Sequence, residues 1–417
     1  MILRHYNFII DRIMILRVEC NRVTVLPVIS TSKSLPRMQN LPQLSLYIHI
    51  PWCVRKCPYC DFNSHAATGS LPEAAYVEAL LADLEQDLTR VAGRTVSTVF
   101  IGGGTPSLFS AGAIRTLLVG IAARLPIESQ AEITLEANPG TAESSKFKGF
   151  RDAGINRLSI GIQSFNDGHL QALGRIHDSR EAKLAVEIAK ASGFTNFNLD
   201  LMFGLPSQTC AEALGDIRCA MELQPTHLSF YQLTLEPNTL FHRYPPSLPE
   251  DDTLWGIQEA CQALLAERGY HQYEVSAYSK EGFRCRHNVN YWLFGDYLGI
   301  GAGAHGKLTD TSGNITRTWK IRHPARYLET AGTLASIGGC DVLQKHELPL
   351  EFLMNHLRLR DGFREAEFTD RTGLTLDRLE PGLSQCLEDA LLEQGKGFIR
   401  CTDKGWNFLD NVLEKFI

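Results

Sequence analysis

Between residues 44 and 237, short hydrophobic runs alternate with longer amphipathic stretches. Each run is rich in β-branched and aromatic residues and stops at a glycine or a polar residue, which is typical of a strand in a parallel sheet. The stretches between the runs, for example 71–88 and 179–193, have the apolar spacing that predicts helices. Six strand–helix units in succession predict parallel strands joined by right-handed crossovers. The six runs are 44–51, 97–104, 131–139, 157–165, 196–204 and 227–237.

Six units are too few for a complete eight-stranded barrel, so the predicted fold class is α/β with an open, partial (β/α)6 barrel. A doubly wound sheet is the alternative that the pattern leaves open. In barrel-like sheets the chemistry lies at the C-terminal ends of the strands. Because these ends share one edge of the sheet, their polar side chains predict a common cavity. Those ends carry a cysteine-containing loop and then Thr105, Glu136, Gln163, Asp200 and Thr234.

Beyond residue 245 the alternation ends. A helix is predicted over 250–270, followed by irregular strands and glycine loops over 270–306. From residue 346 onward the pattern is mostly helical with a short β ending, similar to a winged-helix domain. This part has nine Lys and Arg against fourteen Asp and Glu, whereas a phosphate-binding face needs the opposite sign, so we predict a packing or lid domain. We expect four parts: an N-terminal extension outside the fold (1–43), a barrel core (44–245), a flanking segment (246–345) and a C-terminal domain (346–417).

Composition and charge narrow the class of protein. The 417 residues are 44% hydrophobic with a net charge of −6, which is ordinary for a soluble enzyme and gives no reason to expect a nucleic-acid partner. The eleven cysteines are mostly scattered, which argues against a disulfide framework and for a reducing, cytoplasmic compartment. Residues 1–37 break their short apolar runs with charges. We expect a loose extension with the working protein starting near Met38; a mitochondrial transit peptide is the alternative.

Three of the cysteines form a compact group in the loop after the first predicted strand. Cys53, Cys57 and Cys60 have the spacing C-x3-C-x2-C, and no fourth cysteine follows nearby. A structural zinc site needs four ligands, so Asp61, His49 or His65 would have to complete one. An iron–sulfur cubane held by three thiolates instead leaves one iron open to a chelating ligand. We favour the cubane, because the missing fourth thiolate then marks the working position.

The cysteine spacing after a first strand resembles the radical S-adenosylmethionine superfamily. Tyr59 just before the last cysteine, GGGTPS at the end of the second strand and EANP at the end of the third strengthen the resemblance. In that superfamily the amino and carboxylate groups of S-adenosylmethionine chelate the open iron, and an electron from the cluster cleaves the molecule. The resemblance therefore implies an electron donor, S-adenosylmethionine and a [4Fe-4S] cluster held by Cys53, Cys57 and Cys60.

Further segments, among them SIGIQSF, LGRIH and NLDLMFGLP, make residues 44–417 similar to the oxygen-independent coproporphyrinogen III oxidase family. The glycines allow close backbone approach to a ligand, Glu136 can accept hydrogen bonds from a ribose or an ammonium, and Arg175 can neutralise a carboxylate. Thr234 and His305 match further pocket positions of the family. The positions that contact S-adenosylmethionine there are occupied here by Tyr47, Tyr59, Gly103, Gly104, Thr105, Glu136, Gln163, Arg175 and Asp200.

Two features point to the haem-chaperone subgroup of that family, the HemW type. The true oxidases carry a further cysteine two residues after the third, where this chain has Phe62. The segment HNVNYW at 287–292 matches the H-N-x-x-Y-W motif of the subgroup. The resemblance implies that the chain binds haem, delivers it to respiratory haem proteins and has no oxidase activity. Through these partner proteins it also implies peripheral association with a membrane. The alternative is oxidative decarboxylation of porphyrinogen propionates by the same radical chemistry.

The HNVNYW segment also supplies a candidate haem ligand. An axial donor is needed for iron, and His287 is the obvious candidate. Tyr291 and Trp292 could provide flat apolar walls. The plainer interpretation of the segment is a turn followed by a buried aromatic pair.

Overall fold

The computed structural model describes residues 41–417. The predictions made for residues 1–37 lie outside these described residues. Among residues 41–417, no helix combines the length and the apolar character needed to cross a bilayer.

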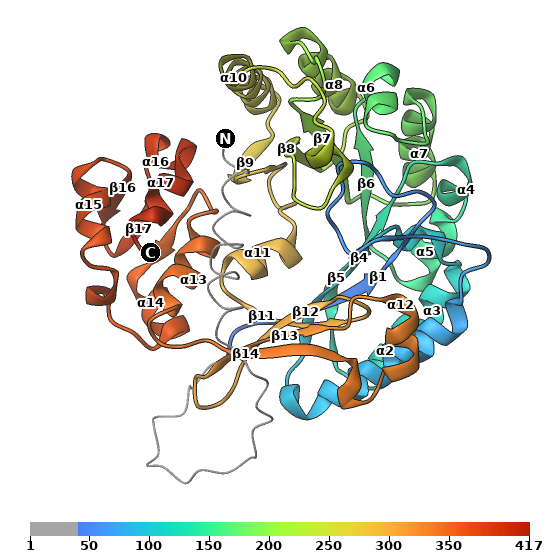
Figure 1. Cartoon of the computed structure of the whole chain (residues 1–417), viewed down its shortest axis with the longest axis horizontal. Helices are drawn as coiled ribbons and strands as arrows, with labels where there is room; N and C mark the ends of the chain where they lie inside the picture. The colour runs from blue at the N-terminus through green and yellow to red at the C-terminus, as the bar shows by residue number, and fades with distance from the viewer. Residues whose placement is uncertain (1–40) are drawn as a thin grey trace.

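A twelve-stranded mixed sheet forms the centre of the molecule and curves around an open middle (Figure 1). Six of its strands are the predicted hydrophobic runs, paired in parallel and in chain order, so the predicted open α/β barrel is confirmed. A seventh parallel strand pairs with the first of them through Leu46 and Leu298. In spatial order the parallel strands are β11 (Asp296–Ile300), β1 (Leu44–Ile50), β4 (Val96–Gly103), β5 (Ile127–Ala137), β6 (Arg157–Gln163), β7 (Phe197–Phe203) and β8 (His227–Gln232).

Antiparallel strands extend the sheet on both sides. Beyond β11 lie β12 (His305–Thr309), β13 (Ile315–Lys320) and β14 (Ile337–Val342), and beyond β8 lie β10 (Ala277–Ser279) and β9 (His271–Glu274). The segment 270–306 thus does contain strands, as predicted. It also contains the helix α11 (Arg286–Trp292), which the pattern did not predict.

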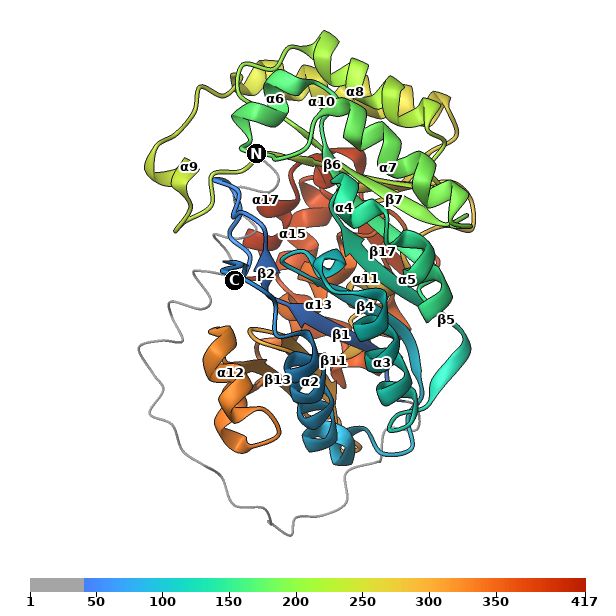
Figure 2. The ribbon, with the colours of Figure 1, turned by 90° about the vertical axis from the view of Figure 1, so that its right-hand side faces the viewer.

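Helices cover the outer face of the sheet (Figure 2). The helices predicted over 71–88, 179–193 and 250–270 are present as α2 (Glu73–Asp87), α7 (Ser179–Ala191) and α10 (Asp251–Glu267). Both α7 and α8 (Cys210–Glu222) begin with a capping box, which satisfies backbone N–H groups of the first turn. The others on this face include α3 (Ala111–Ala122), α5 (Phe147–Ala153) and α6 (Asp167–Ala172).

Alternate residues of each strand face the helices or the open middle, because successive side chains of a strand point to opposite faces. In β1, Leu46 and Ile48 join the main core with the helices, while Tyr47 lies on the other face, in a pocket. In β7, Leu199 joins that core and Asp200 faces the middle. Asp200 therefore lies within β7 and not at its C-terminal end, which corrects the prediction. The inner face of the sheet carries polar side chains along the strands, so a functional side chain can also lie in the middle of a strand.

Helix α11 packs against the inner face of the sheet, near β1, β4 and β11 (Figure 1). Asn290 Nδ2 donates to Ser45 Oγ at 2.8 Å and to the carbonyl of Asp296 at 3.0 Å. His287 Nδ1 and the Thr98 hydroxyl form a hydrogen bond of 2.8 Å. The helix is therefore held by polar contacts to the strands that it covers.

The C-terminal part has its own small sheet and core, as its helical pattern with a β ending predicts. Its strands β15 (Phe363–Arg364), β17 (Phe398–Cys401) and β16 (Leu392–Gly395) pair in that order. The core around Phe352 also takes in Phe294 and Ile315 from the preceding segment, so the two parts share buried apolar surface. The helices are α13 (Leu348–His356), α14 (Glu365–Thr372), α15 (Gly382–Glu388), α16 (Asp403–Asn407) and α17 (Leu409–Glu414).

Candidate functional site

The three clustered cysteines lie in a loop whose two ends are tied together. The short strands β2 (Trp52–Cys53) and β3 (His65–Ala66) pair in parallel and close the loop. Within it, the Cys60 N–H donates to the Cys57 carbonyl at 3.2 Å. All three thiols are free and half-buried, and all three line one pocket of about 460 Å³, here called the cluster pocket. The structure therefore brings together the three residues that their spacing singled out.

Eight of the nine residues matched to S-adenosylmethionine contacts line the cluster pocket. Tyr47 is the exception, because it lines a neighbouring pocket. Thr234, predicted at the strand end, also lines the cluster pocket two residues beyond β8. The eight are Tyr59, Gly103, Gly104, Thr105, Glu136, Gln163, Arg175 and Asp200.

The glycine run at the end of β4 lies directly against the start of the cysteine loop. Gly104 N–H donates to the carbonyl of Ile50 at 2.8 Å, and Thr105 N–H donates to that of Trp52 at 2.7 Å. A Cβ on Gly104 would stand 2.6 Å from the Trp52 carbonyl oxygen, closer than two such atoms can approach. Gly103 has φ +117°, in the left-handed region that favours glycine. The glycines are therefore required for this close contact between two backbones.

Arg175 places its charge beside one of the thiols. Its Nη1 lies 3.6 Å from Cys57 Sγ, while Nη2 donates to Asn138 Oδ1 at 2.7 Å and to the Gly161 carbonyl at 2.8 Å. Its Nε is buried and has no hydrogen-bond partner among residues 41–417. The guanidinium is thus held in one orientation at the wall of the cluster pocket. Its positive charge would suit a ligand carboxylate bound there.

Two buried carboxyl groups face the same pocket. Burial, together with the charge of Asp200, raises the pKa of Glu136 to about 8, although the Gly103 N–H donates to its Oε2 at 3.1 Å. Burial also raises the pKa of Asp200, which accepts from Asn198 Nδ2 at 2.7 Å. Two acids that are costly to ionise together favour a ligand that brings a positive charge or hydroxyl donors. An ammonium group and a ribose meet that requirement.

The residues of the cluster pocket fit the cofactors that the resemblance implies. Burial raises the pKa of Cys53 and of Cys60, and iron would displace their protons on binding. Within the described part of the chain, no group of three or more His, Cys, Asp or Glu side chains is arranged to hold a single metal ion. A cubane makes a different demand, because each thiolate binds its own iron. Three thiols, an arginine and two acids on one pocket match a cluster with a chelating amino acid.

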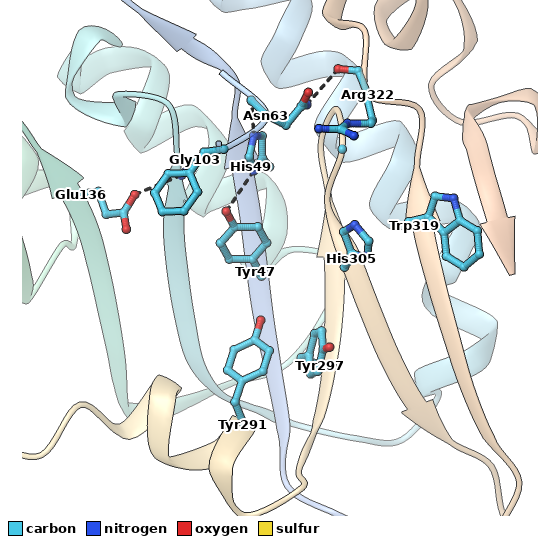
Figure 3. A pocket seen from close by; sticks show the side chains of 12 residues that line it. Tyr47, His49, Asn63, Gly103, Glu136, Tyr291, Tyr297, His305, Trp319 and Arg322 are labelled. Carbon is cyan, nitrogen blue, oxygen red and sulfur yellow. Dashed lines mark hydrogen bonds between the residues drawn. The ribbon is translucent and has the colours of Figure 1, made fainter. Parts of the chain in front are cut away.

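A second pocket, here called the side chamber, adjoins the cluster pocket (Figure 3). Its volume is about 610 Å³. Both pockets are lined by Phe62, Gly103 and Glu136, so the two are neighbours across these residues. The sequence pattern did not predict this chamber, since much of its wall comes from the edge strands. The remaining lining residues are Tyr47, His49, Asn63, Tyr291, Tyr297, Gly303, His305, Trp319 and Arg322.

The HNVNYW segment contributes unequally to the side chamber. Tyr291 lines it, as predicted for a flat wall, whereas Trp292 is not among its lining residues and packs under the guanidinium of Arg358 at 4.3 Å. His287 is 1% exposed and has Phe100 and Tyr291 as ring neighbours, each at 5.1 Å between centroids. Its Nε2 has no partner among the described residues. That His287 binds haem iron stays a prediction.

Comparisons with known proteins agree with the motifs. Residues 47–218 match the radical SAM superfamily, and residues 343–408 match the HemN C-terminal domain. Among curated proteins, the heme chaperone HemW of Escherichia coli is 52% identical over 385 residues, covering 91% of this chain and all of that protein. That of Haemophilus influenzae is 52% identical over 384 residues, covering 91% of this chain and 99% of the relative. That of Bacillus subtilis is 33% identical over 384 residues, covering 89% and 99%.

A solved structure has the same architecture. Coproporphyrinogen III oxidase (HemN) from Escherichia coli superposes with a TM-score of 0.78, covering 90% of each chain. Its sequence is 23% identical, so this likeness concerns the fold.

Proposed function

Because the chain belongs to the HemW family of haem chaperones within the radical SAM superfamily, we propose that it binds haem and delivers it to respiratory haem proteins. In this proposal a [4Fe-4S] cluster and S-adenosylmethionine are bound in the cluster pocket, an external donor supplies electrons, and the cytoplasm is the setting. The names of the curated relatives support the chaperone role. Delivery to respiratory partners and the binding of S-adenosylmethionine go further than those names.

The observation that carries the proposal is Phe62. It stands where the true oxidases of the resembling family have a further cysteine. Its side chain is 60% exposed and lines both the cluster pocket and the side chamber. A phenyl ring can neither bind iron nor hold charge at that position. It does provide apolar surface between two cavities, which suits holding a hydrophobic macrocycle better than transforming one.

The residues have distinct roles in this proposal. Cys53, Cys57 and Cys60 would hold three irons of the cluster. The bound cluster would supply one-electron chemistry and an open iron for S-adenosylmethionine. Arg175 would orient and neutralise the carboxylate of that ligand with its guanidinium charge. Glu136 and Asp200 would accept hydrogen bonds from its ammonium and ribose groups.

The test compares haem binding with porphyrinogen turnover in the same anaerobically reconstituted protein. Titration with haemin, followed by its visible absorption, is expected to saturate at about one haem per chain. Incubation with coproporphyrinogen III, S-adenosylmethionine and a reductant is expected to give no vinyl product above the control without protein. Haem-loaded protein should then transfer its haem to an apo-form respiratory cytochrome faster than it loses haem to buffer.

Two results would contradict the proposal. Conversion of coproporphyrinogen III to protoporphyrinogen above the control, abolished by Cys57→Ala, would identify an oxidase. Failure of the wild-type protein to bind haem at all would remove the chaperone role.

A further inference from the structure

We propose that the side chamber is the haem-binding site, that the imidazole of His305 binds the haem iron, and that Arg322 pairs with a haem propionate. This inference rests on the proposed function, since it takes haem as the ligand, and it adds the location and the ligands. It differs from the sequence-based prediction, which placed the iron on His287.

The side chamber has the size and the walls that a flat macrocycle needs. Its volume of about 610 Å³ falls within the range of small-molecule pockets, roughly 300–1,000 Å³. Tyr291 of α11 and Tyr297 of β11 lie together in its wall, with ring centroids 4.2 Å apart. Trp319 of β13 stacks on His305 with an angle of 25° between the rings. Aromatic faces from three elements thus surround a cavity (Figure 3), and such faces stack well on a porphyrin.

Two imidazoles line the chamber, those of His49 and His305, and the sequence-based candidate His287 lies beside it; the three differ in what already engages them. His49 has both ring nitrogens in hydrogen bonds, with Tyr47 Oη at 2.9 Å and with the Asn63 carbonyl at 2.9 Å. His287 has its Nδ1 bonded to Thr98 and its ring buried between Phe100 and Tyr291. Iron could reach its Nε2 only after that packing opened.

His305 differs from both. It begins strand β12, its side chain is exposed, and it lines the chamber. Within residues 41–417, no hydrogen bond engages its ring nitrogens; its ring contact is the stacking on Trp319. An open imidazole held by stacking is the form that haem iron accepts as an axial ligand. Among the three, His305 is therefore the one that can bind iron without breaking an existing contact.

Arg322 supplies the charge that haem propionates require. It follows strand β13 on the rim of the chamber, and its side chain is exposed (Figure 3). No ion pair holds its guanidinium among the described residues, whereas Arg317 of the same strand pairs with Glu351. A guanidinium can bind a carboxylate through two parallel hydrogen bonds. The Arg322 guanidinium beside an aromatic-lined cavity thus matches haem, which is an apolar macrocycle with two carboxylate side chains.

The rim of the chamber is also tied to the cysteine loop. Asn63 Nδ2 donates to the carbonyls of Ala302 and of Arg322, each at 2.9 Å. Asn63 lies three residues after Cys60, so the loop that would hold the cluster also positions the backbone of the proposed propionate anchor. We therefore expect loss of the cluster to weaken haem binding in the side chamber.

The experiment titrates haemin into the reconstituted full-length protein and compares variants by affinity and by absorption spectrum. His305→Ala should weaken binding at least tenfold and shift the Soret band, and added imidazole should restore the wild-type spectrum. His305→Met should instead give the spectrum of a thioether ligand. Arg322→Gln should weaken haemin at least fivefold but leave haemin dimethyl ester unaffected, because the ester has no carboxylate. Arg326→Gln, an exposed arginine of α12 (Pro324–Thr330), is the matched control and should behave as wild type.

Each outcome decides one part of the inference. Wild-type affinity and spectrum in both His305 variants, with loss in His287→Ala, would overturn His305 as the ligand while leaving the chaperone function intact. Equal effects of Arg322→Gln on haemin and its ester would overturn the propionate anchor. A wild-type protein without any haem binding would refute the proposed function itself. The iron content of each variant shows whether the cluster and its loop have survived the substitution.

Discussion

Cys57 and Arg175 show how single residues set the character of the cluster pocket. The guanidinium is fixed by Asn138 and Gly161, and the Cys57 sulfur lies 3.6 Å from its Nη1. This fixed guanidinium places a positive charge beside the thiols, where a cluster with thiolate ligands would carry negative charge. The pocket is therefore prepared for a negatively charged cluster before any ligand enters.

The first prediction concerns the three clustered thiols. Replacing Cys57 with Ala removes one of three iron ligands, so we expect the brown absorbance and the content of about four irons per chain to be lost on reconstitution. Cys210→Ala, at the half-buried start of α8, should keep both. Iron analysis and visible absorption of the two proteins make the comparison. Full iron retention in Cys57→Ala would rule out the three-thiolate cluster.

A second prediction at this scale concerns pH. Burial lowers the pKa of His356 to about 3, and the ring is stacked on Phe352 at 3.9 Å. The unfolded chain takes up this proton near pH 6.5 but the folded chain does not, so the stability contributed by the neutral ring is present above pH 6.5 and falls as the pH drops toward 3. From pH 7 to pH 5 the loss from this group is about 2 kcal/mol.

His356→Gln removes that ionisation. Whatever the substitution costs at pH 7, the free energy of unfolding should fall less between pH 7 and pH 5 in the variant than in the wild type. Denaturant titrations at the two pH values measure the difference. Equal losses in both proteins would show that the ring takes up its proton at the same pH in the folded chain as in the unfolded one.

At the scale of elements, helix α11 brings the HNVNYW segment to the inner face of the sheet. The hydrogen bonds of Asn290 to β1 and to the start of β11 fix its position, and His287 bonds to β4. This arrangement directs Tyr291 into the side chamber and turns Trp292 toward Arg358 of the C-terminal part. His287 and Asn290 of the motif therefore attach the helix to the sheet, and Tyr291 is the residue of the motif that lines the chamber.

The prediction for this element is a loss of stability when the attachment is cut. Asn290→Ala removes the buried amide that donates to the Asp296 carbonyl and to the Ser45 hydroxyl, and the Ser45 hydroxyl then keeps only the bond from Thr98, so we expect a cost of about 1–3 kcal/mol. Asn288→Ala, at a half-buried position of the same helix, should cost less than about 0.5 kcal/mol. Denaturant unfolding of both variants tests the difference. Equal costs would mean that Asn290 does not anchor the helix.

At the scale of the whole molecule, buried contacts join the C-terminal part to the barrel. Arg358 and Glu274 form a buried ion pair of 2.9 Å, and Arg317 of β13 pairs with Glu351 of α13. Phe294 lies between the barrel segment and the C-terminal core. Such an interface supports a packing role for the C-terminal part. The domain boundaries at residues 245 and 345 stay predictions.

The prediction at this scale concerns the start of the chain. The described contacts of the fold begin at Pro42 and Gln43, whose carbonyls accept from Arg94 and from the Asp296 N–H, and β1 begins at Leu44. A protein starting at Met38 keeps all of these. We expect it to equal the full chain in unfolding midpoint and iron content. An insoluble or iron-free truncated protein would mean that residues 1–37 contribute to the structure.

The sequence by itself determined most strands and helices of the barrel and the grouping of the three cysteines. Strand and helix periods are local, so the six parallel strands and the helices α2, α7 and α10 were readable from side-chain alternation. Cys53, Cys57 and Cys60 lie within eight residues of one loop, and their spacing alone brings them to one pocket. The inner position of Asp200 within β7 was missed, because a run of residues does not reveal which face a buried strand turns to the helices.

Only the tertiary structure decided where the side chamber lies. Tyr47 and Arg322 are far apart in sequence and become neighbours because β11 pairs beside β1 and β12 and β13 follow it outward. Which edge a strand joins depends on the apolar surface that the finished sheet buries, and no local period carries that information. The same pairing leaves His305 open and buries His287. The choice between these two imidazoles therefore rests on long-range packing, although both were visible as histidines from the start.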